Sequence, residues 1–203
     1  MAVRVLQPLR FEPEPTKGSR FIADVVVVTT PDEAKAAIAR VREAFPDATH
    51  HCWAWRLAPD NGHDRQQSSD DGEPGGSAGR PILAQIVGHE VVDVLVVVTR
   101  YYGGTKLGVG GLVRAYGGAA GKALDRAQTQ AFVPTVNVSL SHAYDDSTAV
   151  QGALREHGAQ VVAAAYGEAV QCTVQVAVSA RAALAAALVN ATSGRVRLSD
   201  DDA

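Results

Sequence analysis

Residues 100–121 constrain the fold of this 203-residue chain more than any other stretch, because they combine a strand end, a glycine-rich turn and a helix start. They hold eight of the nineteen glycines and follow the apolar run Val91–Val98, which is typical of a strand covered on both faces. Backbone N–H groups at the start of such a helix can meet an anion. Helical spacing predicts that the helix buries Val109, Leu112, Val113, Tyr116, Ala120, Ala123 and Ala127.

Charge is distributed unevenly around this stretch. Residues 100–130 carry a local charge of +4 and residues 60–73 a local charge of −4, whereas the whole chain carries −3. Arg114, Gly118, Lys122 and Arg126 recur every four residues, and the three charged ones predict a basic stripe on the helix. The two regions could steer a charged partner, but two solvated faces that partly neutralise each other explain them equally well.

We therefore predict a binding site for an anionic partner, RNA in particular, at this strand, turn and helix. Its candidate residues are Arg100, Lys106, Gly108, Gly110, Gly111, Arg114 and Lys122. Neither standard nucleotide loop fits, because Lys106 precedes Gly108 and because Val113 stands where a dinucleotide fingerprint needs glycine. Gly108–Gly111 matches the short Gly-x-x-Gly pattern of KH domains, although a tight turn alone also explains these glycines.

The remaining pattern predicts an α+β chain of two domains, 1–130 and 131–203. Strands are expected at 20–29, 50–57 and 93–102, and helices at 31–45 and 82–87. Residues 58–80, which include Asn61-Gly62 and Asp71-Gly72, are expected to form a long polar loop. After residue 131 the order of strands and helices is β-α-β-β-α-β, which predicts a ferredoxin-like domain.

Other candidate chemistries remain open. His51, Asp70 and Glu73 are the side chains that could act as general acid and base, although acidic residues in such a segment are more often turn formers. His50 and Cys52 share a strand face without a third ligand nearby, so we predict no metal site and no cofactor. Trp53 and Trp55 are expected in a core or groove wall rather than as a base-stacking pair.

The compartment is predicted from absences in the sequence. Two widely spaced cysteines, Cys52 and Cys172, argue against a disulfide framework. No signal peptide is apparent, and the longest apolar run is too short to span a bilayer. We therefore expect a cytoplasmic protein without a membrane partner, and the oligomeric state is left undecided.

Several motifs together resemble the IMPACT/YigZ family over nearly the whole chain. They are Ser19–Ile22, Asp47–Ala54, Ser69–Pro74, Gly79–Leu83, Val97–Gly104, Leu107-Gly108 and Gly110–Tyr116. The resemblance implies an N-terminal β/α sandwich similar to domain 2 of a small-subunit ribosomal protein. It also implies a C-terminal domain similar to those of elongation factor G. Eukaryotic members of the family look like regulators of translation, and bacterial members are the closer match.

Three functional hypotheses follow. The first is a non-enzymatic protein that binds RNA or the ribosome through Arg100–Arg114 and regulates translation. The second is a hydrolase-type enzyme that acts on a phosphorylated or otherwise anionic small molecule. The third is a protein-interaction module whose recognition element is the segment 58–80.

Overall fold

The computed structural model describes residues 2–60 and 63–200. The chain divides into two compact units, residues 1–132 and residues 133–203. The predicted boundary was placed between residues 130 and 131. Each unit has its own hydrophobic core and is described by itself.

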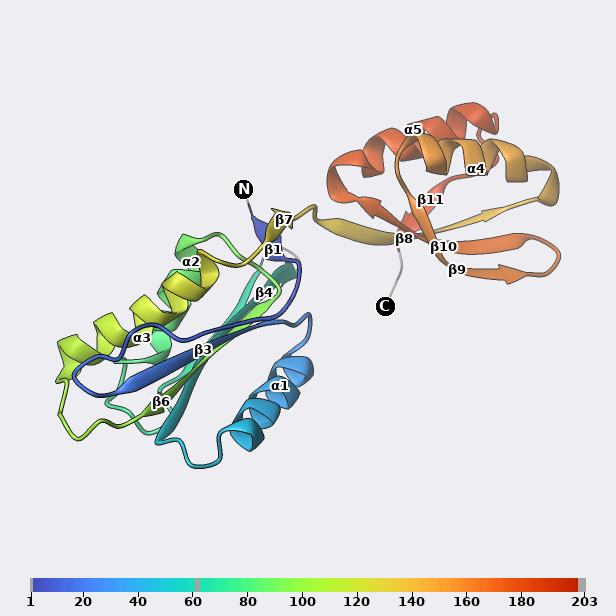
Figure 1. Ribbon diagram of the computed structural model, residues 1–203. Coiled ribbons are helices and arrows are strands. Elements are labelled where there is room, and N and C mark those ends of the chain that lie inside the picture. Colours follow the sequence, from blue (N-terminus) through green and yellow to red (C-terminus); the bar gives the residue numbers. More distant parts are fainter. Residues whose placement is uncertain (1, 61–62, 201–203) are drawn as a thin grey trace. The chain divides into compact units, whose positions relative to one another are not determined.

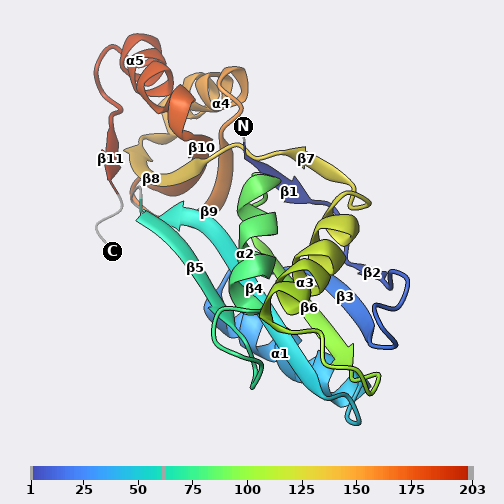
Figure 2. The same ribbon diagram turned by 90° about the vertical axis from the view of Figure 1, so that its left-hand side faces the viewer.

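The N-terminal unit is built on a five-stranded antiparallel sheet (Figure 1). Its strands lie in the order β2 (Leu9–Phe11), β3 (Arg20–Val27), β6 (Val94–Tyr101), β4 (His50–Asp60) and β5 (His63–Ser69). The helices α2 (Gly79–Gly88) and α3 (Val109–Leu124) cover one face of this sheet, and α1 (Pro31–Ala44) covers the other (Figure 2). The short strands β1 (Val3–Val5) and β7 (Thr129–Ala131) pair separately.

Strand β6 lies at the centre of the sheet and is buried on both faces, as predicted. Val94, Val96 and Val98 pack into the core under α2 and α3. Leu95 and Val97 pack into the core under α1. A strand covered on both sides has no need of polar alternation, which explains the continuous apolar run.

The start of α1 was also predicted correctly. Thr30 is the N-cap residue, its hydroxyl accepts a hydrogen bond from the backbone N–H of Glu33, and Pro31 begins the helix. The Glu33 carboxylate reaches back to the backbone N–H of Thr29 at 2.6 Å. The Thr30 bond therefore satisfies an N–H group that the helix leaves unpaired, and the Glu33 bond holds the residue before the cap.

The prediction of a long loop at 58–80 was wrong. Strand β4 continues to Asp60, β5 occupies His63–Ser69, and α2 starts at Gly79. Strand β5 lies at the edge of the sheet, where α1 and α2 leave much of it in contact with water, so its sequence is polar and resembles a loop. Asn61 and Gly62, which were expected to form a turn, lie outside the described residues.

Two of the residues that α3 was expected to bury are exposed. Val109 is 58% and Val113 is 38% accessible to solvent. The buried residues of α3 are Leu112, Tyr116, Gly117, Ala119, Ala120, Gly121, Ala123 and Leu124. Val113 points in nearly the same direction as the buried Ala120, seven residues later, so its position near the start of α3 rather than its face of the helix leaves it exposed.

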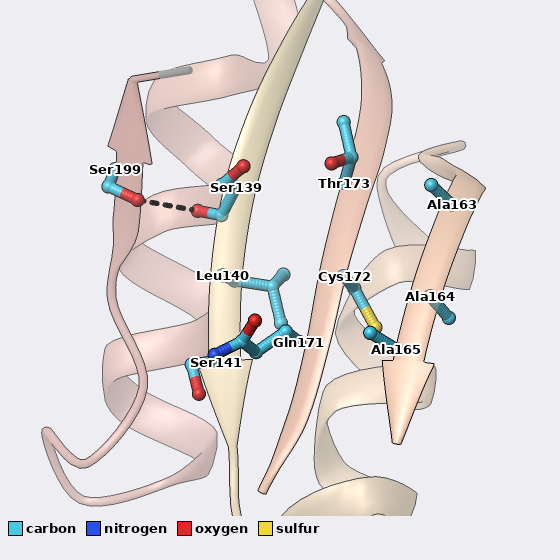
Figure 3. A pocket seen from close by; sticks show the side chains of 10 residues that line it. All are labelled: Ser139, Leu140, Ser141, Ala163, Ala164, Ala165, Gln171, Cys172, Thr173 and Ser199. Carbon is cyan, nitrogen blue, oxygen red and sulfur yellow. Dashed lines mark hydrogen bonds between the residues drawn. The ribbon is translucent and has the colours of Figure 1, made fainter. Parts of the chain in front are cut away.

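The C-terminal unit has the predicted ferredoxin-like order. It contains β8 (Thr135–His142), the short 3-10 helix η1 (Tyr144–Asp146), α4 (Ser147–Glu156), β9 (Gln160–Tyr166), β10 (Val170–Ala177), the 3-10 helix η2 (Val178–Ala180), α5 (Arg181–Ala191) and β11 (Leu198–Asp200). The antiparallel sheet has the strand order β11-β8-β10-β9, and α4 and α5 cover one face. Figure 3 shows a pocket of about 380 Å³ on this sheet, where Ser199 donates a hydrogen bond to the Ser139 carbonyl.

Candidate anion-binding site

A pocket of about 270 Å³ lies where β6 ends and the chain turns into α3. Its lining comes from the 73–74 loop, the end of β6, the 102–108 turn and the first turn of α3. The lining residues are Glu73, Pro74, Arg100, Tyr102, Lys106, Leu107, Gly108, Val109 and Leu112. Three of the seven predicted site residues, Arg100, Lys106 and Gly108, are therefore brought together here.

The N-terminus of α3 forms part of the wall of this pocket. Gly108 is the N-cap residue with φ +69°, a conformation that favours glycine, and no side chain caps the helix. The first bond of the helix runs from the Leu112 N–H to the Gly108 carbonyl, so the N–H groups of residues 109–111 precede the regular ladder. These N–H groups and the helix dipole favour a negative charge at this end.

Arg114 extends the positive charge over the first turn of α3. A Cβ added to Gly110 would lie 3.7 Å from Arg114 Nη1, which places the guanidinium beside the start of its own helix. Lys106 is exposed in the turn just before the helix. These two side chains, together with the 109–111 amides, are the groups with which an anion can interact at this site.

Arg100 does not supply a free positive charge, in contrast to the sequence interpretation. Its side chain is 6% exposed, and its Nη1 donates to Glu73 Oε1 at 2.6 Å. Tyr116 donates to the same carboxylate oxygen at 2.7 Å, and Ser19 accepts from Arg100 Nη2 at 3.3 Å. Neither Tyr116 nor Ser19 was predicted to take part in this network. Arg100 Nε is also buried, and it has no hydrogen-bond partner among the described residues.

Lys122 lies far from the pocket. It belongs to the last turn of α3, about 20 Å along the helix axis from Val109. The neighbouring Arg126 donates to the Lys122 carbonyl and stacks on the Phe11 ring, with 4.0 Å between the guanidinium carbon and the ring centroid. Arg126 lies two residues beyond the end of α3, and Lys122 is not brought together with Lys106.

Asp70 holds the start of α2. Its carboxylate accepts hydrogen bonds from the backbone N–H groups of Gly76, Ala78 and Gly79 at 2.7–2.9 Å. Burial raises the pKa of Asp70, but these bonds outweigh that effect and leave its pKa below the usual value. A carboxylate stabilised in this way in its ionised form is poorly suited to donate a proton.

His51 lies on the opposite face of the sheet from Arg100. It pairs with Thr99, next to the pair of His50 and Arg100, and successive residues of a strand point to opposite faces. Its Nε2 donates to the Phe45 carbonyl at the end of α1. Burial lowers the pKa of His51, against the opposing effect of this bond. The structure therefore does not bring His51, Asp70 and Glu73 together as acid and base.

Asp71 completes a set of three carboxylates that bind separate elements. The Asp71 side chain accepts hydrogen bonds from Arg42 of α1 and from the backbone N–H of His51. Its neighbour Asp70 binds the start of α2, and Glu73 binds Arg100 in the pocket. The acidic run was visible in the sequence, but its division among three elements was not. Among the described residues, no group of three or more His, Cys, Asp or Glu side chains could hold a metal ion.

The tryptophans border a separate groove of about 580 Å³ between α1 and the β4–β5 hairpin. Trp55 is 9% exposed and packs against the α1 core, and Trp53 is partly buried beside it. Lys35 and Ala39 of α1 and Gln67 of β5 contribute to the groove walls. The interpretation of Trp53 and Trp55 as core and groove wall is thus correct.

Comparisons with known proteins match both units. The family model of the Impact N-terminal domain matches residues 17–124, and that of a domain of unknown function, DUF1949, matches residues 140–195. IMPACT family member YigZ of Escherichia coli is 39% identical over 188 residues, which cover 91% of each protein. An IMPACT family member of Haemophilus influenzae is 31% identical and covers 90% of this chain and 89% of its own length.

A solved structure is similar over almost the entire chain. It is described as the crystal structure of an hypothetical protein, has a TM-score of 0.76 and 35% identity, and covers 99% of this chain and 97% of its own. Within the described residues, no helix has both the length and the apolar character needed to cross a membrane.

Proposed function

The chain belongs to the IMPACT family, and we propose that it binds RNA, free or within the ribosome, through the pocket at the N-terminus of α3. The observation that carries this proposal is a helix start without a side-chain cap, which opens into a pocket lined by Lys106, with the Arg114 guanidinium beside Gly110 in the first turn. Backbone amides and exposed basic side chains are the groups that proteins use to contact phosphate. A cytoplasmic location and a regulatory role in translation are part of the proposal.

Electrostatics support a phosphate rather than a neutral partner. The Arg100–Glu73 pair is internally neutral, so Lys106, Arg114 and the helix dipole determine the sign of the potential at the pocket. The pocket on the sheet of the C-terminal unit is a weaker candidate for RNA. Its ten described lining residues, shown in Figure 3, include no basic and no aromatic side chain.

The test measures binding of a fluorescein-labelled single-stranded RNA, and of purified ribosomes, by the wild-type chain at several salt concentrations. We expect binding that weakens steeply with salt, because phosphate contacts release counterions. The double substitution Lys106→Glu and Arg114→Glu should abolish it. Lys122→Glu is the control for the single substitutions Lys106→Glu and Arg114→Glu, because each of the three reverses one positive charge and Lys122 lies at the far end of α3.

Two outcomes would contradict the proposal. One is the absence of salt-sensitive binding to RNA or ribosomes. The other is an equal loss of binding in Lys122→Glu and in the Lys106/Arg114 variant, which would move the contact from the pocket to the whole helix face. The regulatory role is checked by adding the wild-type chain and the double variant to a cell-free translation reaction, where only the wild type should change the yield.

A protein-interaction role has one specific observation in its favour. Strand β5 is an edge strand, and it lies beside the groove of about 580 Å³ bordered by Trp53 and Trp55. Exposed edges of this kind can accept an extended peptide. Ala39→Trp should obstruct the groove and remove a captured protein partner, whereas Ala44→Trp, at the exposed end of α1, should not. Retention of the partner by the Ala39→Trp variant would reject this second candidate.

A further inference from the structure

Three exposed apolar side chains lie on the turn and the first two turns of α3 that form the pocket. Tyr102 is 47%, Val109 58% and Val113 38% accessible to solvent. Two of them, Tyr102 and Val109, line the pocket directly, and all three come from the turn and helix that form it. None belongs to the buried cores of the N-terminal unit. Apolar groups gathered at a pocket that also contains Lys106 and a helix N-terminus indicate a ligand with an apolar surface as well as a charge.

Tyr102 is held in place by neighbours that are themselves fixed. The guanidinium carbon of Arg100 lies 5.5 Å from the centroid of the Tyr102 ring, and the backbone N–H of Tyr102 donates to Thr49 Oγ1 at 3.1 Å. Arg100 is in turn held by Glu73 and Ser19. An aromatic ring that is positioned before a ligand arrives offers a stacking surface at a small entropic cost.

Arg100 adds a second observation at the same place. Its side chain lines the pocket and is 6% exposed, and its Nε has no hydrogen-bond partner among the residues described by the structure. A buried donor without a partner is unusual in a protein interior and is costly to leave unsatisfied. A ligand atom that accepts a hydrogen bond in the pocket would remove this cost.

The size of the pocket limits the kind of RNA. Its volume of about 270 Å³ lies just below the range usual for small-ligand sites. A space of this size can accept a single base and its phosphate. A double-stranded helix, by contrast, is recognised across a wide surface of about sixteen base pairs.

We infer that the pocket holds one unpaired nucleotide of RNA, with its base stacked on Tyr102 and its phosphate at the N–H groups of residues 109–111. This inference rests on the proposed function and names the class of RNA that the same site prefers. Stacking on an aromatic ring requires a base that has left the helical stack, so single-stranded regions and loops are the partners. Val109 borders the base on the side of α3.

The experiment compares fluorescence anisotropy of a labelled single-stranded RNA with that of a duplex of equal length, using wild type, Tyr102→Ala and Tyr102→Phe. We expect tighter binding of the single strand, a loss of about ten-fold or more in Tyr102→Ala, and retention in Tyr102→Phe. The duplex affinity should be the same in all three proteins. Because Tyr102 is half exposed, the variants should fold, which circular dichroism checks.

The possible failures can be told apart. If neither RNA binds, the proposed function itself fails. If both RNAs bind equally and Tyr102→Ala has no effect, RNA binding stands and the stacked nucleotide is wrong. Inorganic phosphate is added as a competitor: complete competition at millimolar concentration, with Tyr102→Ala unchanged, would reduce the site to a simple anion site and overturn the inference. A phosphoserine peptide that competes more strongly than the RNA would overturn it as well.

Discussion

Gly103 lies so close to Gly18 that no side chain fits between them. A Cβ added to Gly103 would be 1.9 Å from the carbonyl carbon of Gly18 and 2.3 Å from the Ser19 nitrogen. Both neighbours are backbone atoms, which cannot rotate away as a side chain can. This contact joins the segment before β3 to the segment after β6, next to the Arg100 network.

Gly103→Ala should therefore destabilise the N-terminal unit strongly. We expect the free energy of unfolding to fall by about 3 kcal/mol or more, because either the backbone must move or Ser19 must lose its bonds to Arg100 and Gly103. Urea unfolding followed by circular dichroism measures the change. Gly75→Ala is the control, since a Cβ at Gly75 meets nothing within 4 Å. Equal stability of the two variants would contradict the close contact.

Removal of one partner from the Arg100–Glu73 pair should cost more than removal of both. The two side chains are 6% and 5% exposed, so Glu73→Ala leaves a buried guanidinium without its counter-charge. We expect a loss of about 3–5 kcal/mol in the free energy of unfolding for Glu73→Ala. The double substitution Glu73→Leu and Arg100→Met should lose less. If the double variant loses the sum of the losses that Glu73→Leu and Arg100→Met show singly in the same urea measurement, the two side chains are not coupled.

Asp70 should make the N-terminal unit sensitive to acid. Its pKa is lower in the folded chain than in the unfolded chain, so its contribution is present above about pH 3.9 and is lost as the pH falls through the folded pKa. At pH 7, Asp70→Asn should lower the free energy of unfolding by about 1–3 kcal/mol. The difference from wild type should shrink below about pH 4. The exposed Glu14→Gln serves as control, and a pH-independent difference would contradict the argument.

The pair of His89 and Asp125 should stabilise the N-terminal unit more at low pH than at high pH, in contrast to Asp70. His89 Nε2 lies 3.0 Å from Asp125 Oδ1 and its Nδ1 lies 2.8 Å from the Gln85 carbonyl, so both nitrogens donate when the ring is protonated. Burial lowers the pKa of His89, but the two bonds outweigh it and raise the pKa above the usual value. The contribution is therefore complete below about pH 6.5 and is lost as the pH rises through the folded pKa.

The measurement for this pair is the difference in unfolding free energy between wild type and Asp125→Asn at pH 5.5 and pH 8.5, chosen as roughly one unit below and two above the usual pKa of histidine. The pair is partly exposed, so we expect less than about 1 kcal/mol at the lower pH and a smaller difference at the higher pH. A difference that grows with pH would show that the sign is wrong.

Cys52 should be unreactive in the folded chain. Burial raises its pKa to about 12, and its Sγ donates to the Asp70 carbonyl at 3.0 Å. At pH 8 roughly one thiol in ten thousand is then ionised, and only the thiolate is a good nucleophile. Iodoacetamide followed by mass spectrometry should label Cys52 in urea but not under native conditions. Native labelling at the rate seen in urea would contradict its burial.

The parts of the fold that could be predicted from sequence are the elements whose own burial determines their pattern of apolar residues. Strand β6 could be predicted because burial of both of its faces produces a continuous apolar run in the sequence. Strand β5 could not be recognised, because an edge strand has few apolar contacts and its pairing with β4 forms only in the tertiary structure. The exposure of Val109 was equally hidden, since the spacing of apolar residues on α3 does not reveal where the sheet below it ends.

The candidate site was predictable in the same uneven way. The glycine-rich turn located Lys106 and Gly108 at one pocket, because neighbours in sequence remain neighbours in space. The neutralisation of Arg100 by Glu73 could not be seen, since the two are 27 residues apart and meet only when the sheet and loop have formed. Lys122 was grouped with the site by its helical spacing, but the length of α3 separates it from the pocket.

The pairing of β1 with β7 gives the N-terminal unit a particular order of assembly. Val3 bonds on one side to Glu90 and Val92 and pairs on the other with Ala131. A chain made from its N-terminus, at about 5–20 residues per second, delivers the last of these partners only after the rest of the unit has been synthesised. On the ribosome, the first strand of this protein must therefore wait with an open edge until the final strand of its own unit leaves the exit tunnel.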